Sequence, residues 1–242
     1  MLKITICDDD VKAADQLRWE VVSFFRSEGV EDLNVSVFNS PVQMLRELNG
    51  ERRDIYLLDV LMPGMNGIEL GHRLRAAGDE GLIIYLTSST EYALESYDVS
   101  AFQYLTKPVE SEKLHDVLRR AVSITQEERL RGVIVRSNSG DAFLPFSQLT
   151  YAELKNRSVC YYTSDGRVIQ GMTIRSAFRD ACAELLRDRR FTIVGASWCV
   201  NLSLITSIDK SAVNFKGGGC LAPSRRAVEE LRTKWLEYWL ES

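Results

Sequence analysis

The sequence predicts two domains in tandem: an α/β domain built on a doubly wound, five-stranded parallel sheet, followed by a mostly-β domain. Three observations lead to this prediction. Strand-length apolar runs alternate strictly with helical patterns in the first half, short strand patterns dominate the second half, and 242 residues can bury two cores. We expect domains at residues 1–122 and 133–242, joined at 123–132 by a linker or helix extension.

Five strands and five helices are expected in the first domain. The strands are expected near residues 3–7, 34–38, 54–58, 82–87 and 102–106. Helical patterns follow them at about 10–27, from Pro41, at about 67–77, after Thr90 and from about Ser111. Ser40 is suited to cap the second of these helices. Strict alternation of strands and helices predicts a parallel sheet with helices on both faces.

The second domain is expected to consist mainly of short strands. They are expected near residues 133–135, 142–144, 151–154, 159–163 and 167–172, with others up to Leu221. A hairpin turn is expected at Ser164-Asp165-Gly166, and helices at about 173–186 and 223–240. So much strand content excludes a helix-turn-helix as the main architecture.

Composition excludes several classes of protein. No apolar stretch reaches the roughly 18 residues of a membrane span, and no N-terminal signal segment is recognisable. The five cysteines include an odd member and no C-x-x-C pair, which favours reduced thiols in a cytoplasmic protein. Only two histidines are present, so a histidine-rich metal site is not favoured. We expect a cytoplasmic protein that does not contact a membrane.

The two halves of the chain carry opposite net charge. Residues 1–126 hold 13 Lys and Arg against 21 Asp and Glu, a net charge of -8. Residues 127–242 hold 17 against 13, a net charge of +4. An acidic half suits a bound cation, and a basic half suits a polyanion such as a nucleic acid.

Four charged residues follow three of the expected strands. Asp8 and Asp9 follow the first strand, Asp59 follows the third and Lys107 follows the fifth. Parallel strands place their carboxyl ends along one edge of a sheet, where ligands of α/β proteins bind. Crowded carboxylates repel one another, so the cluster predicts a hard cation such as Mg²⁺.

The segments around these residues resemble the receiver domain of two-component response regulators, which has a flavodoxin-like fold. The matching segments occur in the family's order and spacing across about 120 residues. They are Ile6 to Asp10, Leu57 to Gly67, Leu86 to Ser88 and Tyr104 to Pro108.

The resemblance implies a role for each landmark. Asp59 would accept a phosphoryl group from a sensor histidine kinase, and the protein would turn over nothing beyond its own phosphorylation and slow dephosphorylation. The expected Mg²⁺ ligands are Asp8, Asp9, Asp59 and the backbone carbonyl of Leu61. The residues expected to bind the phosphoryl group or to switch with it are Thr87, Tyr104 and Lys107. The family also has a cis peptide before the proline that matches Pro108.

The second half resembles the LytTR-type DNA-binding domain over about 110 residues. The matching segments are Tyr151 to Glu153, the Asp165-Gly166 turn, Phe191 to Leu202, Ile205 to Ile208 and Pro223 to Arg226. The resemblance implies that the protein contacts promoter repeats through loops at one edge of the strands. The protein is expected to bind these repeats as a homodimer that forms on phosphorylation. Arg225 matches the loop position that contacts a base. The expected DNA-binding residues are Asn156, Arg157, Lys216, Arg225 and Arg226.

One loop departs from the LytTR pattern. Ile193, Gly195 and Ala196 stand where the family usually has Arg, His and Arg. A bidentate base contact contributes roughly 1–3 kcal/mol of discrimination, so this loop has lost donors that could read DNA. Arg175 and Lys210 are further basic residues that could compensate.

Two other functions remain open at this point. In the first, the receiver controls an interaction regulator whose C-terminal domain binds RNA, protein or DNA non-specifically. In the second, the chain is a Mg²⁺-dependent phosphatase of the haloacid-dehalogenase type. Such enzymes need an aspartate two residues after the nucleophile, where this chain has Leu61, which cannot transfer a proton.

Overall fold

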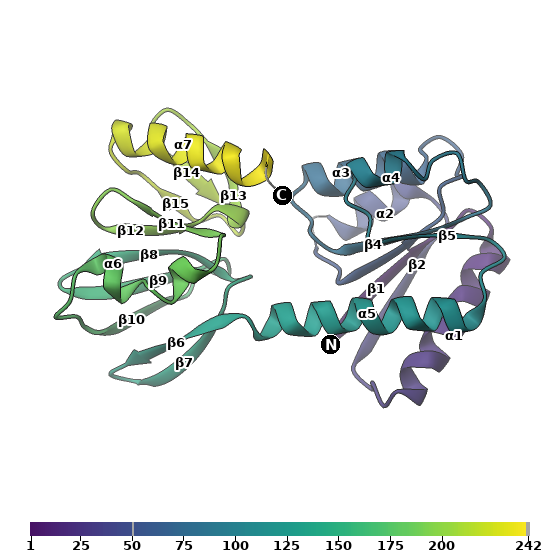
Figure 1. Cartoon of the computed structure of the whole chain (residues 1–242), viewed down its shortest axis with the longest axis horizontal. Coiled ribbons are helices and arrows are strands. Elements are labelled where there is room, and N and C mark those ends of the chain that lie inside the picture. Colours follow the sequence, from purple (N-terminus) through teal and green to yellow (C-terminus); the bar gives the residue numbers. More distant parts are fainter. Residues whose placement is uncertain (50, 241–242) are drawn as a thin grey trace. The chain divides into compact units, whose positions relative to one another are not determined.

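The chain divides into two compact units in the computed structural model, which describes residues 1–49 and 51–240. The division falls between Thr125 and Gln126. Each unit has its own sheets and its own buried cores, as expected for two independently packed domains. The predicted α/β domain followed by a mostly-β domain is confirmed (Figure 1).

The first unit is built on one five-stranded parallel sheet. Its strands are β1 (Leu2–Cys7), β2 (Leu33–Phe38), β3 (Ile55–Leu58), β4 (Leu82–Thr87) and β5 (Gln103–Thr106). They are ordered β2-β1-β3-β4-β5, so the chain reverses its direction of winding between β1 and β3. In sheets of this kind, the crevice outside the carboxyl ends at that reversal is where ligands bind.

Helices cover both faces of this sheet. They are α1 (Val11–Ser27), α2 (Pro41–Leu48), α3 (Gly67–Ala76), α4 (Glu95–Asp98) and α5 (Ser111–Leu130). One core packs α1 and α5 against the sheet, and a second core packs α2 and α3 against the opposite face (Figure 1). Successive residues of β3 alternate between these cores: Leu57 faces the first core and Leu58 faces the second.

Two local features of the first unit are present where expected but are weaker than the sequence indicates. Ser40 occupies the N-cap position of α2, but its side chain makes no capping hydrogen bond. The helix expected after Thr90 is α4, which is only four residues long. The Ser89 hydroxyl accepts a hydrogen bond from the Glu91 N–H, so side chains in this segment offer the backbone a turn in place of a helix.

The second unit contains three antiparallel sheets. Its strands are β6 (Gly132–Ser137), β7 (Gly140–Pro145), β8 (Leu149–Lys155), β9 (Ser158–Thr163), β10 (Val168–Thr173), β11 (Phe191–Val194), β12 (Trp198–Asn201), β13 (Ile205–Ile208), β14 (Val213–Phe215) and β15 (Cys220–Leu221). The largest sheet has the order β10-β9-β8-β12-β11. The other two are the hairpin β6-β7 and the small sheet β13-β14-β15.

The helix expected at about 173–186 is replaced by a short helix, α6 (Phe178–Ala181), and a 3-10 turn at Leu185–Arg187. Thr173 instead pairs with Ser158 in the sheet, and the Ile174 N–H donates to the Arg157 carbonyl. Backbone pairing with the start of β9 and the residue before it therefore holds Thr173 and Ile174 extended. The final helix, α7 (Arg225–Leu240), packs Val228 and Leu231 inward as expected.

Helix α5 continues without interruption from the first unit to Leu130. The expected helix extension in 123–132 is thus the last part of this helix, which ends just before β6. Within residues 1–49 and 51–240, no helix is both long enough and apolar enough to cross a membrane.

Candidate functional site

The carboxyl ends of β1 and β3 bring two aspartates together. Asp8 follows Cys7, the last residue of β1, and Asp59 follows Leu58, the last residue of β3. Cys7 and Leu58 are paired in the sheet, and the Asp59 N–H donates to the Cys7 carbonyl at 2.8 Å. Strand register therefore fixes the separation of the two aspartates.

Three carboxylates form one cluster at this edge of the sheet. Asp8, Asp9 and Asp59 can each offer an oxygen such that all three atoms lie within 4.8 Å of one another. Asp8 is buried, Asp59 is half-buried and Asp9 is exposed, so the cluster is open to solvent on one side.

Lys107 reaches the same cluster from the end of β5. Its Nζ lies 2.7 Å from Asp8 Oδ2 and 3.2 Å from Asp59 Oδ2. Its backbone N–H donates to the Thr87 carbonyl at 2.8 Å, and the peptide bond to Pro108 is cis, as the receiver resemblance implies. One ammonium thus faces two carboxylates that would otherwise repel each other.

Backbone N–H groups orient the two inner carboxylates. Asp8 Oδ1 accepts from the Asp10 N–H at 3.0 Å, and Asp59 Oδ1 accepts from the Val60 N–H at 2.7 Å. The other oxygen of each carboxylate faces Lys107. Each carboxylate is therefore contacted at both of its oxygens.

The protonation states of the neighbouring groups follow from this arrangement. Burial lowers the pKa of Lys107, but hydrogen bonds and attraction from Asp8 and Asp59 outweigh burial and raise its pKa overall. Burial, together with repulsion from the carboxylates, raises the pKa of Cys7 to about 12. The ammonium is therefore charged at neutral pH, and Cys7 is a neutral thiol that offers no thiolate ligand.

The donor set fits a hard divalent cation. Three carboxylates and one ammonium leave a formal charge of about -2 at the edge of the sheet. Their oxygen atoms are the ligands that Mg²⁺ prefers, and one open side leaves room for water or substrate oxygens. Leu61 is exposed beside Asp59, and its N–H lies 3.4 Å from Asp59 Oδ1.

Thr87 and Tyr104 are connected through one loop residue. Thr87 is the last residue of β4 and is fully buried, and its Oγ1 accepts from the Ser89 N–H at 3.3 Å. The Tyr104 hydroxyl donates to the Ser89 carbonyl at 2.7 Å. Both side chains therefore contact the loop that follows β4.

Sequence reasoning gave no role to three residues that support the site. Asn39 donates from Nδ2 to the Asp8 carbonyl at 2.9 Å, and Ser89 joins Thr87 to Tyr104. A Cβ on Gly67 would lie 2.1 Å from the Asp59 carbonyl oxygen, so only glycine fits there. The glycine was visible in the motif, whereas the contacts of Asn39 and Ser89 depend on the folded loops.

Three of the basic or polar DNA-contact candidates lie at one end of the largest sheet of the second unit. Asn156 and Arg157 form the turn between β8 and β9, and both are exposed. The exposed Arg175 follows Ile174, whose N–H donates to the Arg157 carbonyl. The Leu154 N–H donates to the Ser197 carbonyl, so the turn between β11 and β12 lies at this same end.

Lys216 lies at the opposite end of β9 from Arg157. A Cβ on the adjacent Gly217 would lie 1.7 Å from the carbonyl oxygen of Ser164, the residue that follows β9. Arg157 immediately precedes that strand. The structure thus does not gather all the expected DNA-binding residues into one cluster.

Two positions in the second unit differ from expectation. Arg225, which matches a loop position in the LytTR resemblance, is the first residue of α7, within the helix expected at about 223–240, and Arg226 is the second. The side chain of Arg225 is 89% exposed and forms an ion pair with Glu229 at 3.5 Å, and Arg226 is exposed as well. Ile193 lies within β11 and packs against a core, so only Gly195 and Ala196 belong to the exposed turn.

Comparison with known proteins identifies the family of the first unit and finds relatives along most of the chain. Residues 4–119 match the response regulator receiver domain family. The transcriptional regulatory protein YpdB of Escherichia coli K12 is 23% identical, with 86% of each chain covered. The positive alginate biosynthesis regulatory protein of Pseudomonas aeruginosa is 26% identical, and the sensory transduction protein LytT of Bacillus anthracis is 24% identical. Each of these two alignments covers 96% of this chain and 98% of the relative.

The first unit is a receiver domain, and the chain is a response regulator. Its relatives are regulators of the LytTR type, so the chain belongs to this group of two-component regulators that control transcription. The alternative, an interaction regulator whose C-terminal domain binds RNA, protein or DNA non-specifically, is not favoured. Response regulators as a class are not enzymes that turn over a substrate.

Proposed function

We propose that Asp59 is the residue that becomes phosphorylated and that a sensor histidine kinase is the physiological donor. The observation that carries this proposal is the convergence of Asp8, Asp9 and Asp59 on one side with the Lys107 ammonium on the other. Asp59 combines a half-buried carboxylate with an oxygen already oriented toward that ammonium.

The chemistry is transfer of a phosphoryl group between two nucleophiles. A carboxylate oxygen of Asp59 forms a bond to phosphorus as the bond from phosphorus to the histidine nitrogen of the donor breaks. Lys107 offsets the negative charge on the transferred oxygens. Asp8, Asp9, Asp59 and the Leu61 carbonyl would hold Mg²⁺, which supplies further charge neutralisation when bound. The expected activity is self-phosphorylation and slow self-dephosphorylation only.

The connection between Thr87, Ser89 and Tyr104 supports a way to transmit the change. A phosphoryl oxygen on Asp59 offers the Thr87 hydroxyl a charged acceptor. If Thr87 turns toward it, the Ser89 N–H loses its partner, and the loop that also holds the Tyr104 hydroxyl is released to rearrange. Thr87, Tyr104 and Lys107 are therefore the proposed switch residues.

The proposed output is binding to promoter repeats as a homodimer formed on phosphorylation, in the cytoplasm. Two linked DNA-binding domains raise the apparent affinity for repeated half-sites through effective concentration. The proposed contacts are Asn156, Arg157, Lys216, Arg225 and Arg226. Exposed donors beside the turn that contains Gly195 and Ala196 support the idea that neighbouring loops compensate for the side chains missing from that turn.

Replacing Asp59 tests the phosphorylation site directly. Full-length protein is incubated with Mg²⁺ and radiolabelled acetyl phosphate, a small phosphodonor. We expect Asp59→Asn to abolish incorporation, because an amide is a poor nucleophile. The control is Asp10→Asn, since asparagine caps a helix as well as aspartate does and Asp10 caps α1. Undiminished labelling of the Asp59 variant would refute the assignment.

The DNA proposal is tested by selection from random oligonucleotides at near-physiological salt. The full chain is compared with and without acetyl phosphate and Mg²⁺. We expect a repeated motif to be enriched and enrichment to increase on phosphorylation. Binding that shows no motif under either condition and disappears as salt rises would contradict sequence-specific recognition.

A further inference from the structure

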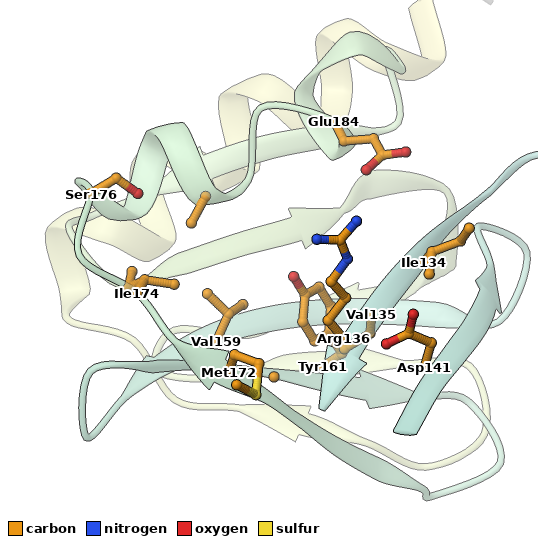
Figure 2. A pocket seen from close by; sticks show the side chains of 12 residues that line it. Ile134, Val135, Arg136, Asp141, Val159, Tyr161, Met172, Ile174, Ser176 and Glu184 are labelled. Atoms are coloured by element: carbon orange, nitrogen blue, oxygen red, sulfur yellow. The ribbon is translucent and has the colours of Figure 1, made fainter. Parts of the chain in front are cut away.

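A pocket of about 580 Å³ lies in the second unit, between the β6-β7 hairpin, β9, β10 and the segment around α6 (Figure 2). Its volume is within the range of small-molecule sites, roughly 300–1,000 Å³. Its lining includes none of the acidic-site residues and none of the proposed DNA contacts. The functions proposed above therefore leave this pocket without a role.

One side of the pocket is apolar. Val159, Met172 and Ile174 contribute aliphatic and thioether surface. Gly171 also lines the pocket, and a Cβ there would lie 3.5 Å from Cε2 of Tyr161. Because glycine has no side chain, the edge of the Tyr161 ring stays uncovered on this side. The pairing register of β10 shifts between Gln170 and Thr173, and irregularities of this kind are common beside binding sites.

Two hydrogen-bond donors face the same space. Tyr161 is only 8% exposed and lines the pocket, and its hydroxyl is not among the buried polar atoms that lack a hydrogen-bond partner in the described part of the chain. The Arg136 guanidinium forms no ion pair within that part of the chain, although Asp141 is its cross-strand neighbour. Figure 2 shows both side chains directed into the pocket. Both groups can donate to an acceptor on a ligand, and the hydrogen bond from the charged guanidinium would be the stronger of the two.

We propose that this pocket binds a small monocarboxylate with an apolar body. The carboxylate accepts hydrogen bonds from Arg136 and Tyr161, and the body covers Val159, Met172 and Ile174. Burial, together with nearby Cys182, Cys199 and Glu184, raises the pKa of Tyr161 to about 12, so the hydroxyl is a donor at neutral pH.

The rim of the pocket restricts the charge of the ligand. Glu184 and Asp141 are exposed carboxylates in the lining. They repel negative charge in general, so they disfavour inorganic phosphate and dicarboxylates more strongly than a monoanion whose single charge faces Arg136. The apolar side, the two donors and the acidic rim together favour a ligand with a single negative charge at one end and an apolar body at the other.

Titration calorimetry on the full chain tests the proposal with defined probes. Phenylacetate and 4-methylpentanoate are the carboxylates, phenylacetamide is the uncharged match to the first, and inorganic phosphate is the anion without an apolar body. We expect both carboxylates to bind at micromolar to millimolar concentration and the amide to bind about tenfold more weakly. Phosphate is expected not to bind at this pocket.

Variants locate the binding site. Arg136→Gln is expected to weaken phenylacetate about tenfold, and Tyr161→Phe to weaken it by a smaller factor. Arg187→Gln is the matched control, because Arg187 is also exposed but does not line the pocket. Thermal unfolding without ligand checks that Arg136→Gln, a change at an exposed residue, leaves the fold intact. Equal binding of acid and amide, absence of binding, or unchanged binding by Arg136→Gln would each overturn the proposal.

Discussion

Gly67 lets helix α3 approach the backbone of Asp59 more closely than any other residue could. A Cβ added to Gly67 would lie 2.1 Å from the carbonyl oxygen of Asp59. The Gly67 N–H also donates to the carbonyl of the next residue, Val60. The first residue of α3 is thus packed directly against the backbone of the proposed phosphoacceptor. A change at Gly67 should therefore affect both stability and chemistry.

Gly67→Ala is expected to destabilise the receiver domain by about 1–3 kcal/mol, because backbone must move to admit the methyl group. Phosphate incorporation should fall in parallel as Asp59 shifts. The measurements are urea unfolding and acetyl phosphate labelling. Gly78→Ala is the control: Gly78 has a φ of +70° but open space around its Cβ position. It should cost about 1 kcal/mol and leave labelling unchanged.

Lys107→Gln tests separately how charge at the acidic site affects Mg²⁺ binding and how it affects phosphate incorporation. Without the ammonium, the three carboxylates attract a cation more strongly, so calorimetric titration should show Mg²⁺ binding that is at least as tight as in the unchanged chain. Phosphate incorporation should nevertheless fall at least about tenfold, because in the proposed mechanism Lys107 stabilises the transferred oxygens. Parallel loss of Mg²⁺ binding would instead indicate that Lys107 only maintains the structure of the site.

At the scale of elements, a buried charged side chain of the second unit contacts the last turns of α5, which belong to the same unit. Arg190 is 7% exposed, and its Nε and Nη2 donate to the two oxygens of Asp188 at 2.9 and 2.8 Å. Its Nη1 contacts Glu128 in the last turns of α5, and its guanidinium lies 5.5 Å from the centre of the Phe146 ring. The Arg190 side chain therefore contacts the last turns of α5, Phe146 directly after β7, and Asp188 shortly before β11.

Arg190→Met is expected to destabilise the second unit by about 3–5 kcal/mol, because the change leaves Asp188 buried without its main partner. Glu128→Gln should cost only about 1 kcal/mol, since Glu128 is more exposed and an amide can still accept a hydrogen bond. Urea unfolding of both variants measures the difference. Equal, small effects would mean that the ion pair does not stabilise this contact.

The same ion pair predicts a pH dependence. Burial raises the pKa of the Asp188 carboxyl, but hydrogen bonds and attraction from Arg190 outweigh burial and hold this pKa below its ordinary range. The carboxylate therefore contributes stability above the unfolded-state pKa of about 3.9, and that contribution disappears as pH falls through the lower folded-state pKa. Stability of the unchanged chain should drop below about pH 4, and Arg190→Met should show a smaller drop in that window.

At the scale of the whole molecule, the proposed function assigns cation binding to the acidic receiver and DNA binding to the basic second unit. If Arg157 contacts a DNA phosphate, Arg157→Gln should lower the slope of log affinity against log salt by about 0.9. Arg167→Gln is the matched control: Arg167 is held by Asp165, at 2.7 Å, in the turn at the other end of β9. Equal slopes for both variants would argue against a phosphate contact by Arg157.

Much of the receiver could be predicted because its signals are local. Each apolar run is one strand, and Asp59 and Lys107 each directly follow the last residue of a strand. The helix expected at about 173–186 was wrong because the Ile174 backbone pairs with the Arg157 carbonyl, a contact between segments remote in sequence. Phe178 and Cys182 lie four residues apart within that segment, and both are buried.

The sequence by itself determined the two domains, the parallel sheet and the residues at its carboxyl edge, because parallel strands carry their ends to one side whatever the loops do. Only the tertiary structure decided that Ile193 packs in a core, that Lys216 lies far from Arg157 along β9, and that Arg136 and Tyr161 face one pocket. Antiparallel register and loop packing in the second unit depend on long-range pairing, which the order of residues along the chain does not reveal.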